Sequence, residues 1–167
     1  GTSDTVRYQG IAKLTVNMGM VGYTIHELNA AIAKAEAGNW GTDDAQHAWD
    51  EGWAFFHGPE ANYGCSPAKV MEKRAADFGT ADADGNAATF IATRNAMNDG
   101  LTALQNEDMQ GVTDARDEVL KNLVIVYSQA VLKYTSKMDS NDTAEKYQAE
   151  GYAFWKAIEA YAGPHMH

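Results

Sequence analysis

The chain has 167 residues, enough for one domain with a substantial core. Hydrophobic residues make up 45% and charged residues 22%, which is an ordinary globular composition, and no apolar run reaches the roughly 20 residues that span a bilayer. The net charge of −10 argues against a nucleic-acid partner, and the single cysteine excludes an intrachain disulfide and a cysteine-based zinc site.

Helical periodicity predicts a long first helix over residues 4–37. Asp4 can cap its start, and Gly38 stands where a helix commonly ends. Its apolar residues recur in steps of three and four, which predicts one buried stripe: Ile11, Leu14, Met18, Val21, Ile25, Leu28, Ile32 and Ala35.

Three shorter helices are predicted next. A second helix, capped by Thr42 or Asp43, stops at Gly58-Pro59. Ser66-Pro67 is an N-cap followed by a first-turn proline, so it starts a short third helix that ends at Phe78-Gly79. A fourth helix covers residues 86–105. The second helix is expected to turn six residues inward: Ala45, Ala48, Trp49, Gly52, Phe55 and Phe56.

The fifth helix is predicted to open at Thr113 and Asp114. Its middle, residues 123–127, is apolar nearly all round and is expected to be the most buried segment. A polar break after residue 138 separates it from a sixth helix that runs through Tyr161. No useful stretch alternates with period two, so the sequence predicts an all-α fold, an antiparallel bundle of about six helices.

A short phrase occurs twice in the sequence. Residues 51–56 read EGWAFF and residues 150–155 read EGYAFW, and each copy follows a longer helix and a polar break. This indicates an internal helix–turn–helix repeat within one domain, residues 1–167. The repeat units are about 6–57 and 113–162, with a helical segment, 58–112, inserted between them.

The repeated phrase carries a candidate metal site. Glu51 and Glu150 fall on equivalent flanks of their helices, so in a pseudo-symmetric bundle the two carboxylates could converge. His47 precedes Glu51 by four residues and can face the same side. Oxygen ligands with an occasional histidine or tyrosine suit Fe(III) or Mn.

The first helix offers further ligands of the same kind, because Tyr23, His26 and Glu27 are spaced i, i+3, i+4.

Glu51 and Glu150 also allow a structural interpretation. Arg74 and Arg94 lie among apolar residues of the third and fourth helices, and a buried arginine needs a carboxylate partner. In that case Glu51 and Glu150 form ion bridges that only fix the helix register.

Catalysis is not expected. The chain has no Glu-x-x-His motif, no glycine-rich phosphate loop and no nucleophile elbow. A carboxylate-bridged metalloenzyme remains a third hypothesis.

Residues 49–58, together with 68–80 and 149–155, resemble the algal low-iron-inducible periplasmic proteins, also described as high-carbon-dioxide-inducible or iron-assimilation proteins. The likeness runs in order from about residue 20 to 161. It implies a secreted, periplasmic or cell-surface protein of iron acquisition with no established enzymatic activity. The iron motifs proposed for the family are Glu-x-x-Glu pairs, which this chain lacks, and only Glu51 and Glu150 match its acidic positions.

The combined prediction is an extracytoplasmic iron-acquisition protein that binds iron, most simply Fe(III), through carboxylate-rich side chains inside a helical bundle. Glu51 and Glu150 are the main ligands, and a cell-surface iron transporter is the expected partner. His47, Tyr23, His26 and Glu27 are the supplementary ligands. The alternative is a metal-free helical interaction domain of a secreted or surface protein.

Overall fold

A computed structural model describes residues 3–59, 65–139 and 144–162, and six helices form in these residues, as the periodicity predicts. They are α1 (Asp4–Glu36), α2 (Ala45–His57), α3 (Pro67–Phe78), α4 (Ala88–Gln105), α5 (Met109–Met138) and α6 (Ala144–Ala162). No strand is present in the described residues, where Ala81 and Ala87 form only an isolated bridge. The all-α bundle is confirmed.

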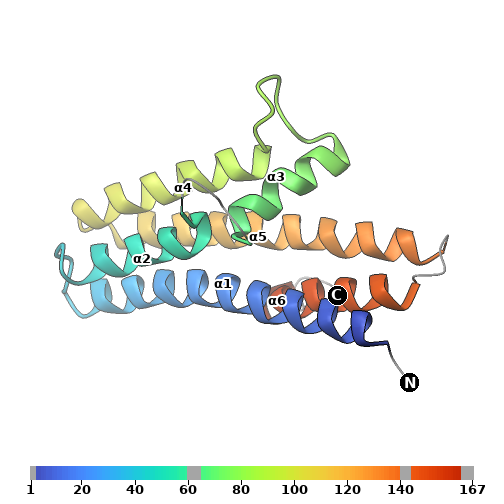
Figure 1. Cartoon of the computed structure of the whole chain (residues 1–167). Helices are drawn as coiled ribbons and strands as arrows, with labels where there is room; N and C mark the ends of the chain where they lie inside the picture. The colour runs from blue at the N-terminus through green and yellow to red at the C-terminus, as the bar shows by residue number, and fades with distance from the viewer. Residues whose placement is uncertain (1–2, 60–64, 140–143, 163–167) are drawn as a thin grey trace.

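Two long helices, α1 and α5, run the length of the molecule, and the others pack along them (Figure 1). The second half of α1 packs against α2, where Gly52 approaches Thr24 and Leu28. The first half of α1 packs against α6, where Gly10 approaches Ala149. Both α4 and α6 pack on α5, and α3 covers α5 beside α2 and α4. The helices α2 and α6 therefore occupy different halves of α1.

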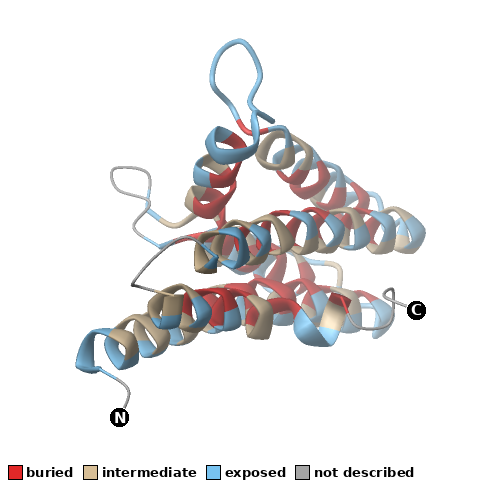
Figure 2. Cartoon of the chain, turned by 90° about the vertical axis from the view of Figure 1, so that its right-hand side faces the viewer, coloured by how far each residue is buried: buried red, intermediate tan, exposed pale blue. Residues whose placement is uncertain are grey.

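The buried residues line the faces that these helices turn toward one another (Figure 2). The largest side chains without solvent contact include Trp49, Phe56, Met71 and Tyr127. None of the described helices combines the length and apolar character that crossing a membrane requires.

Local signals set most helix ends where the sequence predicts them. Ser66 Oγ accepts a hydrogen bond from the Lys69 amide, Pro67 occupies the first turn of α3, and Gly79 ends it in the left-handed conformation with φ 64°. The cap of α1 is Ser3, one residue before the predicted Asp4. These ends are encoded within a few residues of each terminus.

The predicted start of α5 is wrong by four residues. The helix begins at Met109 and is capped by Asp108, whose Oδ1 accepts a hydrogen bond from the Gly111 amide at 3.1 Å. Glu107 adopts a positive φ of 55° and makes the turn from α4 tight. Thr113 therefore lies inside the helix, where its hydroxyl donates to the Met109 carbonyl.

The predicted stripe on α1 is correct only in the second half of the helix. Val21, Ile25 and Leu28 are buried, but Ile11 is 67% and Met18 46% exposed. Polar residues take buried positions instead, and Asn17 is the first of them. The first half of α1 packs against α6 on one side and lines a cavity on another, and Ile11 and Met18 lie on its exposed side.

The central run of α5 is also only partly buried. Leu123, Val126 and Tyr127 are inaccessible to solvent, whereas Ile125 is 39% exposed. A helix that packs against α4 and α6 still leaves one side to solvent.

The two glycines of the repeated phrase provide a matched test of packing. A Cβ on Gly52 would lie 2.9 Å from Leu28 Cδ2, whereas a Cβ on Gly151 would lie 3.4 Å from Tyr134 Cβ. Gly52→Ala is therefore expected to lower the free energy of unfolding by about 1 kcal/mol, because overpacking against buried Leu28 outweighs the gain in helix propensity. Gly151→Ala is expected to keep or raise it, by up to about 1 kcal/mol.

Urea denaturation of the two variants measures the difference. Equal losses in both variants would contradict this account of the two contacts. The prediction of an internal repeat does not depend on the outcome, because it concerns the origin of the two units rather than their packing.

Candidate functional site

The predicted ligands on α2 lie together at its surface. His47 Nε2 is 3.4 Å from Glu51 Oε1, as the i, i+4 spacing predicts, and the two side chains are 60% and 48% exposed. Both groups are thus accessible to a dissolved ion.

The predicted ligands on α1 lie at the same helix pair. Tyr23 stacks on Phe55 of α2 with ring centroids 5.1 Å apart and meets His26 edge-on at 6.0 Å. His26 Nε2 is 3.9 Å from Glu27 Oε1. Among the residues that the structure describes, however, no three His, Cys, Asp or Glu side chains come close enough to hold one metal ion.

Glu150 lies away from this group, so the predicted convergence of Glu51 and Glu150 is wrong. Helix α6 contacts α1 near Gly10, just before its copy of the repeated sequence. Helix α2 contacts α1 at Thr24 and Leu28, through Gly52 of the other copy. At about 1.5 Å per residue, these contacts are roughly 20 Å apart along the α1 axis. Glu150 is buried, only 5% exposed, whereas Glu51 is open to solvent.

The alternative pairing with arginines is not observed either. Arg74 is buried as predicted, but its Nη2 binds Asp77 Oδ2 of its own helix at 2.8 Å. Arg94 is exposed, because other residues form the buried face of α4, among them Thr93 and Met97. In the described parts of the chain, no ion pair joins Glu51 or Glu150 to either arginine.

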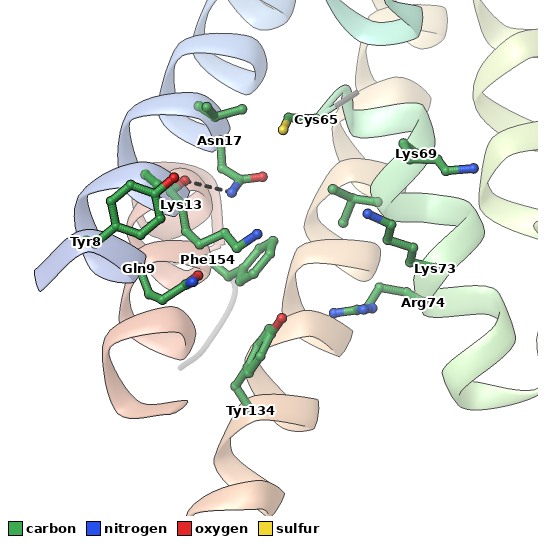
Figure 3. A pocket seen from close by; sticks show the side chains of 13 residues that line it. Tyr8, Gln9, Lys13, Asn17, Cys65, Lys69, Lys73, Arg74, Tyr134 and Phe154 are labelled. Atoms are coloured by element: carbon green, nitrogen blue, oxygen red, sulfur yellow. Dashed lines mark hydrogen bonds between the residues drawn. The ribbon is translucent and has the colours of Figure 1, made fainter. Parts of the chain in front are cut away.

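A cavity of about 430 Å³ lies between the first half of α1 and α3 (Figure 3). Residues one helical turn apart on α1 line one wall, and α3 supplies the opposite wall with the same spacing. Phe154 of α6 lies beside Lys13, and Tyr134 of α5 lies below in this view. The α1 wall comprises Tyr8, Gln9, Ala12, Lys13, Val16 and Asn17, and the α3 wall Lys69, Val70, Lys73 and Arg74, with Cys65 just before that helix.

The cavity is positively charged although the chain is strongly acidic. It holds four of the 13 lysines and arginines, and none of the described acidic residues lines it. Lys69 turns its ammonium group to Glu72 at 2.7 Å, away from the cavity (Figure 3). Lys13 reaches into the gap from α1, and Lys73 and Arg74 reach into it from α3. Such a site attracts anions.

One tyrosine, Tyr134, lines this cavity, and a second, Tyr127, bonds to the lining residue Asn17. Burial raises the pKa of Tyr134, and the nearby Glu150 carboxylate raises it further, while Arg74 opposes the rise. Burial also raises the pKa of Tyr127, whose hydroxyl donates to Asn17 Oδ1 at 3.1 Å. Asn17 Nδ2 in turn donates to the Lys13 carbonyl at 2.7 Å. Asn17 is therefore fixed where it borders the cavity.

The sequence carried one unused signal for this cavity. Three cations, Lys69, Lys73 and Arg74, fall within one run of six residues although the chain is acidic overall. They share one helical face. Their partner Lys13 is about 60 residues away in sequence, so only the packing of α1 against the rest of the bundle reveals it.

Comparison with known proteins gives one family. The family described as "low iron-inducible periplasmic protein" matches residues 2–159, nearly the whole chain. No curated protein and no solved structure shows significant similarity to it.

Proposed function

The chain belongs to the low iron-inducible periplasmic protein family, and from this membership we propose that it captures iron outside the cytoplasm by reversible binding, without chemical turnover. The family match over residues 2–159 is the observation that carries this proposal. The captured iron would pass to a cell-surface transporter. Iron is here the cargo of the protein and not a resident cofactor.

The side chains of the α1–α2 pair are the proposed direct ligands. Glu51 and Glu27 offer carboxylates, Tyr23 a phenol, and His47 and His26 imidazoles, donor types that suit Fe(III), although no three of the described His, Asp and Glu side chains are placed to hold one ion together. The closest pair, His47 and Glu51, is exposed, so water would fill most coordination positions. We expect such a site to bind iron weakly and release it readily, as delivery requires. Glu150 is too far away to join these residues.

A thermal titration tests direct ligation. The melting temperature of the full chain is followed with Fe(III), Fe(II) under anaerobic conditions, Mn(II) and Ca(II). Iron at about 100 times its Kd should stabilise the fold by about 2.7 kcal/mol. The double variant Glu27→Gln with Glu51→Gln should lose that rise, whereas Glu36→Gln, an exposed change on α1, should keep it.

One observation favours the metal-free interaction domain as the second candidate. Ile11 and Met18, two turns apart on α1, are exposed although both are large and apolar. If no metal shifts the melting temperature, direct ligation is wrong and the metal-free interaction domain is favoured.

A further inference from the structure

The cavity between α1 and α3 has the charge of an anion site. In the described parts of the chain, Lys13 and Lys73 form no ion pair. The chain as a whole carries ten more negative than positive charges, so two lysines at one cavity without a described ion-pair partner are unusual here. Unpaired ammonium groups facing one cavity repel each other, and a bound anion relieves that repulsion.

Arg74 adds a buried, fixed cation to the cavity, so the cavity is more than a patch of surface lysines. Its side chain is only 6% exposed and lines the cavity. Asp77 holds Nη2, and the guanidinium carbon lies 5.9 Å from the centre of the Tyr134 ring. Asp77 thus fixes the guanidinium at the cavity wall, from which it reaches into the cavity (Figure 3).

The shape of the cavity selects the kind of anion. Lys13 stands on one wall and Lys73 on the other (Figure 3), so the two ammonium groups approach the cavity from opposite sides. Apolar side chains also line the cavity, including Val16, Val70 and Phe154. The volume of about 430 Å³ is that of a small-molecule site and exceeds what one inorganic phosphate fills.

The geometry points to a binding site for a small organic anion with two or more separated carboxylates, either free or as its iron(III) complex. Lys13 and Lys73 bind carboxylates at its two ends, Arg74 donates from the buried side, and the apolar residues cover the carbon skeleton. This inference goes beyond the proposed function, because it concerns an anion and not a bare cation. It offers a route to iron that needs no protein ligand on the metal.

Isothermal titration calorimetry of the full chain with citrate tests it. Wild-type protein should bind one citrate per chain, and binding should weaken as the salt rises from about 0.05 M to about 0.3 M. Lys13→Gln and Lys73→Gln should each weaken binding by about tenfold, the loss of one charge-assisted hydrogen bond. Lys34→Gln is the matched control on α1, roughly 30 Å from Lys13 along the helix, and should change binding less than twofold.

Comparison of several ligands shows whether the bound species is the free organic acid or its iron(III) complex. Citrate should bind more tightly than acetate, which has one carboxylate, and more tightly than inorganic phosphate. Iron(III) citrate binding at least as tightly as free citrate identifies the metal complex as the ligand, and weaker binding identifies the free acid. Citrate is titrated without iron, so a failed metal titration at the α1–α2 pair leaves this result intact.

Three results would overturn the inference. They are the absence of saturable citrate binding, phosphate binding as tight as citrate binding, and a loss in Lys34→Gln as large as in the cavity variants. Lys73 is exposed and Lys13 half-buried, so both variants should fold, which circular dichroism verifies.

Discussion

Replacing Trp49 with alanine is expected to lower the free energy of unfolding by about 4 kcal/mol. The indole is 1% exposed, and its Nε1 donates to the Met97 carbonyl of α4 at 2.9 Å. It lies directly against Gly100, where a Cβ would come within 2.0 Å of the ring. Truncation would leave a cavity between α2 and α4 and remove the hydrogen bond from Nε1 to the Met97 carbonyl.

Trp53, one turn later on the same helix, is the control. It is half-buried and stacks on His57 with ring centroids 4.9 Å apart. Trp53→Ala should cost less than half as much in urea denaturation followed by circular dichroism. Gly100→Ala should destabilise the wild type strongly but the Trp49→Ala background little, because the clash then has no partner. Equal losses in the two tryptophan variants would refute this picture of the core.

Helix positions could be predicted because their signals are local. Ser66, Pro67 and Gly79 each act on a backbone group within four residues, so α3 is readable from its own sequence. The start of α5 shows where such reasoning fails. Thr113 and Asp114 form a reasonable cap pattern, but Asp108 reaches the helix first after the tight turn at Glu107.

Burial was harder to predict, because periodicity gives the spacing of a face but not its neighbours. Met18 continues the apolar spacing of α1 and is exposed, whereas polar Asn17 is buried beside Tyr127. Arg94 is exposed for a related reason. The α4 face that carries Gly100 packs against Trp49, and Arg94 lies on another side of the helix.

In the candidate site, too, contacts within one helix could be predicted and contacts between helices could not. The His47–Glu51 pair lies within one helix and follows from its spacing. The relation between Glu51 and Glu150 depends on which half of α1 each helix contacts, and sequence symmetry does not fix that. The cavity joins Lys13 to Lys73 across two helices, so it emerges only from the assembled bundle.

Replacing Asp77 with asparagine is expected to lower the free energy of unfolding by about 3 kcal/mol. Asp77 serves two cations, since Oδ2 binds Arg74 Nη2 at 2.8 Å and Oδ1 binds Lys133 Nζ of α5. Arg74 is nearly inaccessible to solvent, so removal of the carboxylate charge leaves a buried guanidinium without a counter-ion. The side chain of Asp77 is 26% exposed, which keeps the loss below that of a fully buried pair.

Glu72→Gln is the matched control on the same helix. Glu72 also binds a lysine, Lys69, but both side chains are 36% exposed, so the loss should stay below about 1 kcal/mol. Adding Arg74→Met to Asp77→Asn should recover much of the stability, because the uncompensated buried charge is gone. Urea denaturation of these variants gives the values. Similar small losses in Asp77→Asn and Glu72→Gln would show that Arg74 does not depend on Asp77, and with that Asp77 would no longer be the residue that fixes the guanidinium at the cavity wall.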